Sequence, residues 1–136
     1  MADQTVTLRA GINNVGNYQV SGIPFVTGNL VSPSSSAGAV PLEVVFPSIT
    51  QRIIFQNHGA IHVRVGFSAN GLKTTNNFYL VEPSGSVELR VKTNKLYLLS
   101  NSPAANVTSG TLSAELTGIV PGFDLVAAYS GSAGIG

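Results

Sequence analysis

Two histidines come closest to a metal-ligand pattern in this chain. His58 and His62 stand four positions apart, a spacing that would place two imidazoles on one face of a helix. The residues around them predict a turn instead, with His58 in the turn 57–60 and His62 on the outer face of the strand that follows. No carboxylate or cysteine stands near them to supply the third ligand that a protein metal site needs. We therefore expect no metal and no other cofactor.

The groups that perform acid–base or nucleophilic catalysis are equally scattered. Serine is plentiful, but the Gly-x-Ser-x-Gly pattern of a nucleophile elbow is absent, and the glycines of 131–136 are not in the order of a dinucleotide-binding loop. The acidic residues are isolated from one another, so no pair is spaced for a shared acid–base role; they are Asp3, Glu43, Glu82, Glu88, Glu115 and Asp124. We expect no enzymatic activity, and a site assembled across subunits is the alternative that remains open.

Recognition of nucleic acid or sugar has little support either. The net charge is +1, and the seven Lys and Arg are spread between Arg9 and Lys95, which is not the basic footprint of a nucleic-acid-binding protein. Sugar-binding sandwiches commonly expose tryptophan, and this chain has none, which leaves Tyr18, Tyr79 and Tyr97 as stacking candidates. We expect these tyrosines to pack on strands.

Processing and membrane signals are also missing from the sequence. The first residues lack the basic and apolar regions of a signal peptide, and no uncharged apolar stretch approaches 18 residues. We therefore expect no membrane span. Asn106-Val107-Thr108 matches the N-glycosylation acceptor pattern in a predicted loop, and without a secretion signal we expect this acceptor to be unused.

Alternation of apolar and polar residues predicts an all-β chain. In 61–68 and 86–92 every second residue is apolar, as in strands with one buried face, and Gly, Pro, Asn and Ser separate the alternating runs. The predicted strands are 18–25, 41–46, 49–57, 61–68, 78–81, 86–92, 95–99 and 111–117. We expect a flexible loop over 28–39, a turn at Asn70-Gly71 with a polar loop to 77, and a further loop over 101–109. No window has the spacing of a convincing amphipathic helix.

Eight short strands suit one antiparallel sandwich with arms at both ends. We expect a core over 18–119, an N-terminal arm over 1–16 and a C-terminal arm over 120–136. Because the Cys, Trp and Cys of an immunoglobulin domain are missing, we favour a jelly roll of two four-stranded sheets. In that topology the strand 49–57 lies beside 86–92. Arg52 and Glu88 should then face each other on the outer surface, where such a pair contributes little to stability.

The surface is poorly charged for a free soluble protein. Charged residues make up 10% of the chain and hydrophobic residues 43%, whereas about a quarter of an average domain is charged. We interpret the deficit as a sign that other subunits cover much of the surface. A surface rich in Ser, Thr and Asn is the alternative.

Several strand and turn patterns resemble those of the penton proteins of large icosahedral double-stranded DNA viruses. The likeness is carried by 64–71 (RVGFSANG), 76–81 (NNFYLV), 86–92 (SVELRVK) and 114–119 (AELTGI). The resemblance implies a single jelly-roll capsid protein that forms homopentamers at the fivefold vertices of a virion. Its neighbours would be the double jelly-roll major capsid trimers and the minor capsid proteins. The alternatives are another viral or phage minor capsid or decoration protein, and a carbohydrate- or receptor-binding module.

Both predicted arms carry the residues that we expect to contact other subunits. In the N-terminal arm apolar and polar residues alternate over 5–10, and the segment 120–129 is apolar although it lies outside the eight strands. The predicted contact residues are Val6, Leu8, Arg9, Phe123, Leu125 and Tyr129. For 120–129 an extra edge strand on its own domain is an equally weighted alternative.

Overall fold

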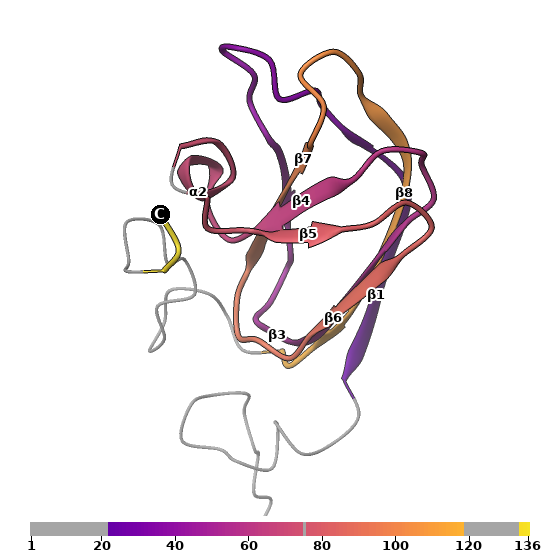
Figure 1. Cartoon of the computed structure of the whole chain (residues 1–136). Helices are drawn as coiled ribbons and strands as arrows, with labels where there is room; N and C mark the ends of the chain where they lie inside the picture. The colour runs from indigo at the N-terminus through magenta and orange to yellow at the C-terminus, as the bar shows by residue number, and fades with distance from the viewer. Residues whose placement is uncertain (1–21, 75, 119–133) are drawn as a thin grey trace, which may run out of the picture.

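The computed structural model describes residues 22–74, 76–118 and 134–136, which form a sandwich of antiparallel strands (Figure 1). Eight strands and one short helix follow in chain order: β1 (Ile23–Ser32), β2 (Leu42–Val45), β3 (Thr50–Asn57), β4 (Val63–Gly66), α2 (Ala69–Lys73), β5 (Tyr79–Val81), β6 (Ser86–Leu89), β7 (Lys95–Ser100) and β8 (Val107–Leu116). The prediction of an all-β chain with eight strands in two antiparallel sheets is confirmed.

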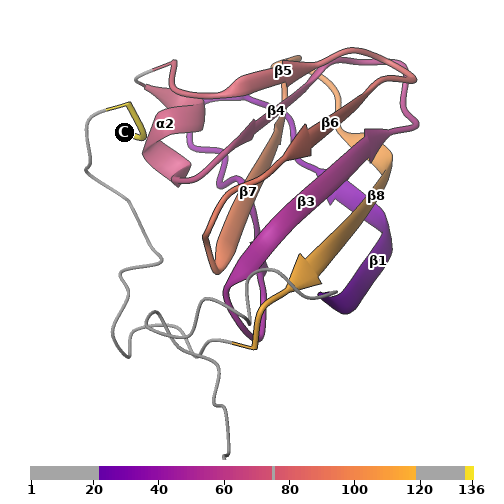
Figure 2. The same cartoon turned by 90° about the horizontal axis from the view of Figure 1, so that it is seen from below.

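The two sheets have the strand orders β1-β8-β3-β6 and β2-β7-β4-β5, and every pair of neighbours is antiparallel. The edge strands are therefore β1 and β6 in the first sheet, and β2 and β5 in the second. A tight turn over 82–85, closed by a 2.9 Å hydrogen bond from Gly85 N to Glu82 O, joins β5 to β6. These two edges consequently lie together on what we call the β5/β6 side (Figure 2). The opposite edges, β1 and β2, form what we call the β1/β2 side.

The core lies between the sheets and is built from the inward positions of the strands. Val63 and Val65 of β4 are fully buried, so the alternation predicted for 61–68 is confirmed. Ile53 and Phe55 of β3 are fully buried as well. The inward positions predicted for 111–117 are confirmed as well, since Leu112, Ala114 and Leu116 are buried. At the end of the core the Phe25 and Phe46 rings meet edge to face with their centroids 5.3 Å apart, an arrangement that aromatic quadrupoles favour.

Two predicted loops proved partly wrong because strands extend into them. The predicted loop 28–39 begins too early, since β1 continues to Ser32 with register shifts on either side of Leu30. Asn29 has a φ of 53°, so Gly28 and Asn29 form an irregularity within the strand rather than its end. The predicted loop 101–109 ends too late, because β8 begins at Val107, which is buried and pairs with Ser32. Residues 18–21 of the first predicted strand lie outside the described residues.

The predicted turn at Asn70-Gly71 is wrong, because these residues belong to α2. Ser68 is the N-cap of this helix, and its Oγ accepts a 2.9 Å hydrogen bond from Gly71 N. The helix contributes one fully buried side chain, that of Leu72. Arg64 Nη1 also donates a 2.9 Å hydrogen bond to Leu72 O. A five-residue helix with one buried apolar side chain has no detectable hydrophobic period, which is why the sequence pattern did not reveal it.

Candidate functional site: the edges of the sandwich

Exposed apolar side chains gather at the edges of the two sheets. Within the described residues, every large apolar side chain that is exposed lies on an edge strand or two positions before one. They are Ile23, Val26 and Val31 of β1, Val40 before β2, Val45 of β2, and Tyr79 and Leu80 of β5. Exposed apolar groups next to unpaired edge backbone are typical of surfaces that another chain covers. Both the β1/β2 side and the β5/β6 side carry them.

Val26 is the most exposed apolar residue of β1, with 70% of its surface accessible. It borders a shallow hollow of about 280 Å³ on the outer face of the first sheet, together with Pro24 of β1, Ile54 of β3 and Ser113 of β8. Gly22 lets β1 begin close to β8, because a Cβ at Gly22 would lie 2.5 Å from the Cβ of Glu115. The outer face near β1 is therefore recessed, and the hollow has both apolar residues and the charged residues Arg52 and Glu115 at its border.

The centre of the same outer face carries an ion-pair network. Arg52 Nε lies 2.9 Å from Glu88 Oε1, Arg52 Nη1 lies 3.9 Å from Glu115 Oε2, and Arg90 Nε lies 3.3 Å from Glu88 Oε1. The predicted pairing of Arg52 with Glu88, and of their strands β3 and β6, is confirmed. The hydrogen bond from Arg52 holds the pKa of Glu88 below its ordinary value and raises the pKa of Arg52. The charges on this face thus pair with one another.

We expect the Arg52→Gln variant to raise the pKa of Glu88 toward 4.5, its ordinary value. Because the folded-state pKa is lowered, the ionised carboxylate stabilises the fold above the unfolded-state pKa, and this stabilisation is lost as the pH falls through the folded-state value. Titration of the side-chain carboxyl carbon by NMR would measure the change. The matched control is Arg90→Gln, which should shift the pKa of Glu88 less because the Arg90 side chain is 80% exposed. Equal shifts in both variants would contradict the assignment.

The outer face of the second sheet pairs its charges in the same way. Glu43 of β2 accepts a 3.3 Å hydrogen bond from Tyr97 Oη of β7 and lies 3.5 Å from Lys95 Nζ. Burial, followed by the neighbouring Glu43 carboxylate, raises the pKa of Tyr97. Arg64 of β4 donates a 2.9 Å hydrogen bond from Nε to Asn101 Oδ1, and its guanidinium lies 4.9 Å from the centre of the Phe78 ring. The charged groups of this face thus pair with partners of the same face, including Glu43 on the edge strand β2.

The predicted subunit-contact residues of the arms all lie outside the described residues, so their role stays a prediction. They are Val6, Leu8, Arg9, Phe123, Leu125 and Tyr129. The last three residues of the chain are described, and they lie beside α2. Ser68 Oγ is 2.9 Å from Ile135 O and 2.7 Å from Gly136 O. This contact could not be predicted, because nothing in the sequence pattern links Ser68 to a residue 67 positions away.

His58, His62 and Asn106 are the residues whose types match a metal-ligand or glycosylation pattern. His58 is exposed in the turn after β3, and its backbone N donates a 2.9 Å hydrogen bond to Ser109 O. His62 is half-buried just before β4. No group of three potential metal ligands occurs within the described residues. Asn106 is exposed, and its Oδ1 accepts a 2.8 Å hydrogen bond from Ser34 N.

Comparison with known proteins finds no protein-family model and no curated protein that matches this chain. Within 22–74, 76–118 and 134–136, no helix is long and apolar enough to cross a membrane.

Proposed function

We propose that this protein is a structural capsid subunit with a jelly-roll fold, which forms homopentamers at the fivefold vertices of an icosahedral virion. The strand order supports the fold. The first strand pairs with the eighth, and the third lies between the eighth and the sixth, as expected for two interlocked Greek keys. The seventh strand likewise lies between the second and the fourth. Because one fold can serve many functions, the role of the protein has to be argued from its surface.

The observation that carries the proposal is the presence of exposed apolar groups on two opposite sides of the sandwich. A closed ring needs two unlike surfaces on each subunit, so that one surface meets the other surface of the next copy. The β1/β2 side offers Ile23, Val26 and Val45, and the β5/β6 side offers Tyr79 and Leu80. Repeating the contact between these sides around a fivefold axis would cover the exposed apolar groups of every subunit.

The pairing of charges within both outer faces supports the same proposal. The ion pairs of Arg52 and Glu88, and of Lys95 and Glu43, lie on strands of one sheet each. Such internal pairs offer little net charge to an oppositely charged partner. The edges, with exposed apolar side chains and unpaired backbone, are better suited to another copy of the same chain.

The test is the absolute mass of the protein in solution, measured by light scattering behind a sizing column. We expect a mass near five times 14.0 kDa. Val26→Glu on the β1/β2 side and Leu80→Glu on the β5/β6 side should each break the ring, because each places a charge in a desolvated contact. The matched control is Gln56→Glu, which adds the same charge at an exposed position of the inner strand β3.

Mixing the two ring-breaking variants distinguishes a ring contact from a symmetric one. In a head-to-tail ring the Val26→Glu chain keeps an intact β5/β6 side, and the Leu80→Glu chain keeps an intact β1/β2 side. The mixture should therefore form a two-chain complex that neither variant forms alone. A monomeric parent protein, or a parent mass that both variants retain, would contradict the proposal.

A further inference from the structure

Asn70-Gly71 in α2 is a dipeptide of the kind that loses the asparagine amide readily in an unfolded chain, because glycine leaves the following peptide nitrogen unhindered. In that reaction Gly71 N attacks the side-chain carbonyl carbon of Asn70. A C–N bond forms, and the side-chain amide leaves as ammonia with the proton of the peptide N–H. Water then opens the cyclic imide to aspartate or isoaspartate, so the reaction needs no oxidant, reductant or metal.

The structure of α2 keeps the two reacting groups from meeting. Gly71 is buried, and its backbone N donates a 2.9 Å hydrogen bond to Ser68 Oγ. Burial and this bond both disfavour the deprotonated nitrogen that attacks. The Asn70 side chain is held one turn further along, because Thr74 Oγ1 donates a hydrogen bond to Asn70 Oδ1. The nitrogen is thus bound toward the start of α2 and the carboxamide toward its end.

The Ser68 hydroxyl that binds Gly71 N is itself held by the last residues of the same chain. Ser68 Oγ is 2.9 Å from Ile135 O and 2.7 Å from Gly136 O. A hydroxyl can accept one hydrogen bond and donate another. The Ser68 side chain is 1% exposed, so water does not replace these partners while the contact is closed. Residues 134–136 therefore fix the acceptor of Gly71 N.

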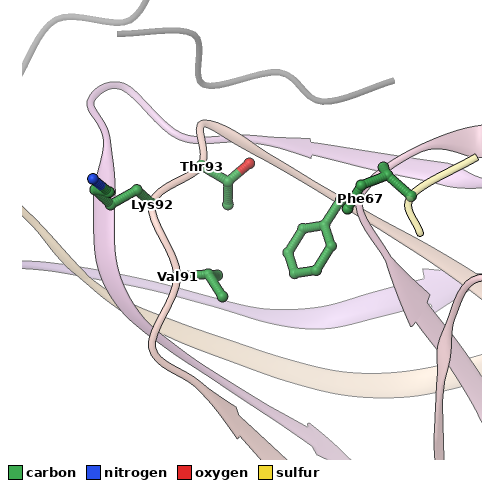
Figure 3. Close-up of a pocket in the computed structure, with 5 residues that line it drawn as sticks. Phe67, Val91, Lys92 and Thr93 are labelled. Carbon is green, nitrogen blue, oxygen red and sulfur yellow. The ribbon is translucent and has the colours of Figure 1, made fainter. Parts of the chain in front are cut away.

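An apolar contact holds 134–136 in this position. Ile135 borders a hollow of about 260 Å³ lined by Phe67, Val91 and Thr93. Figure 3 shows the Phe67 ring and the Val91 and Thr93 side chains around this space. Burial of an apolar side chain at such a wall stabilises the contact.

The same contact requires a glycine after Asn70. A Cβ at Gly71 would lie 2.1 Å from Ile135 O, a separation that nonbonded atoms do not adopt. Within a helix alanine has a higher propensity than glycine, so the helix itself does not explain the glycine. The close approach of Ile135 thus selects the residue that makes the dipeptide reactive.

We propose that Asn70-Gly71 is a latent deamidation site, which residues 134–136 keep unreactive by fixing the first turn of α2. The contact lies within one chain, so this inference does not depend on the ring. Separation of 134–136 from α2 would remove two partners of Ser68 and let the first turn open. An isoaspartate at 70 adds a carbon atom to the backbone, which changes the spacing that joins Gly71 N to Ser68. Opening of the contact would therefore leave a permanent covalent change in the chain.

The test is the rate of deamidation at Asn70 in the full-length protein at mildly alkaline pH. Cleavage after Arg64 and Lys73 releases the peptide 65–73, in which Asn70 is the one asparagine. Its mass and retention time distinguish asparagine, aspartate and isoaspartate. The protein unfolded in guanidinium chloride gives the unprotected rate, and the folded parent should react more slowly by about tenfold or more. Equal rates would overturn the proposal.

Two variants open the contact from opposite sides. Ser68→Ala removes the hydroxyl that binds Gly71 N, and Ile135→Asp places a charge against the apolar hollow. Each should accelerate deamidation at Asn70 about fivefold, the increase in opening expected when a helix end loses its N-cap serine. If Ile135→Asp reacts at the parent rate, residues 134–136 give no protection and the proposal is wrong.

Two control variants separate local opening of α2 from unfolding of the whole domain. Ser86→Ala makes the same chemical change as Ser68→Ala at an exposed position of β6. Val107→Ala removes buried apolar atoms from β8, in the other sheet. Both should deamidate at the parent rate, because opening of α2 does not require unfolding of the core. Equal acceleration in Val107→Ala and Ile135→Asp would show that the reaction follows global unfolding, which would overturn the role of 134–136.

Discussion

We expect the Asn57→Ala variant to have a free energy of unfolding about 3 kcal/mol below that of the parent protein. Asn57 ends β3 and is only 1% exposed. Its Nδ2 donates hydrogen bonds to Ile61 O at 2.8 Å and to Glu82 O at 3.3 Å, and its Oδ1 accepts one from Gly59 N at 2.9 Å. One amide therefore fastens the end of the first sheet to the turn before β4 and to the chain after β5 in the second sheet. Alanine would leave these buried backbone groups without their partner.

Urea denaturation of both proteins at the same chain concentration would measure this loss, since association shifts apparent stability with concentration. The control is Gln56→Ala at the preceding, exposed position, where we expect a change within about 0.5 kcal/mol. Asn57→Asp should also destabilise the fold, because it keeps an acceptor for Gly59 but removes both donors and buries a carboxylate. A loss below about 1 kcal/mol for Asn57→Ala would show that the neighbouring backbone groups find other partners.

The β-sheet architecture could be predicted because its signal is local and repeated. A period of two in 61–68, 86–92 and 111–117 places every second residue in the core, and the structure buries Val63, Leu89 and Leu112 as the pattern requires. The pairing of Arg52 with Glu88 could be predicted as well. It needed only the topology and the fact that both residues occupy outward positions of neighbouring strands.

The elements that were missed owe their structure to contacts distant in sequence. β1 continues past Gly28 because it pairs with β8 more than 70 residues away, and its irregularity at Asn29 looks like the start of a loop when only local residues are considered. α2 forms because Leu72 is buried and Ser68 caps the first turn. Neither interaction leaves a periodic pattern in five residues.

The candidate functional surfaces were likewise predictable only where the signal is local in sequence. The low fraction of charged residues led us to predict a covered surface, which stays a prediction. Which apolar residues are exposed depends on which strands are at the edges, and strand order is a property of the whole sheet. The contact between the end of the chain and α2 was missed for a stronger reason. It joins Ser68 and Gly71 to Ile135 through one hydroxyl and the space left by a missing side chain, and serine and glycine are too common in loops to indicate such a contact.

Phe55→Ala should be the most destabilising single substitution considered for this protein, at about 4 kcal/mol. The Phe55 ring is fully buried in β3 between the two sheets. Gly110 of the paired strand β8 lies against it, because a Cβ at Gly110 would be 3.0 Å from Phe55 Cε1. Removing the ring leaves a cavity that rigid strands on both sides cannot close, so the cost includes lost burial and the unfilled space.

Because Gly110 contacts the Phe55 ring, the prediction can be tested by the coupling energy between substitutions at the two positions as well as by the stability lost in Phe55→Ala. In the parent protein Gly110→Ala should destabilise by about 1 kcal/mol, because the new methyl group crowds the Phe55 ring. In the Phe55→Ala background the same methyl group would enter the cavity, so there Gly110→Ala should be neutral or stabilising. A double-mutant cycle from urea unfolding should thus give a coupling energy of about 1 kcal/mol or more. If the two destabilisations simply add, the sheets must shift to relieve the contact with the new methyl group. Gly110 would then be needed for the backbone conformation of β8 and not to leave room for the Phe55 ring.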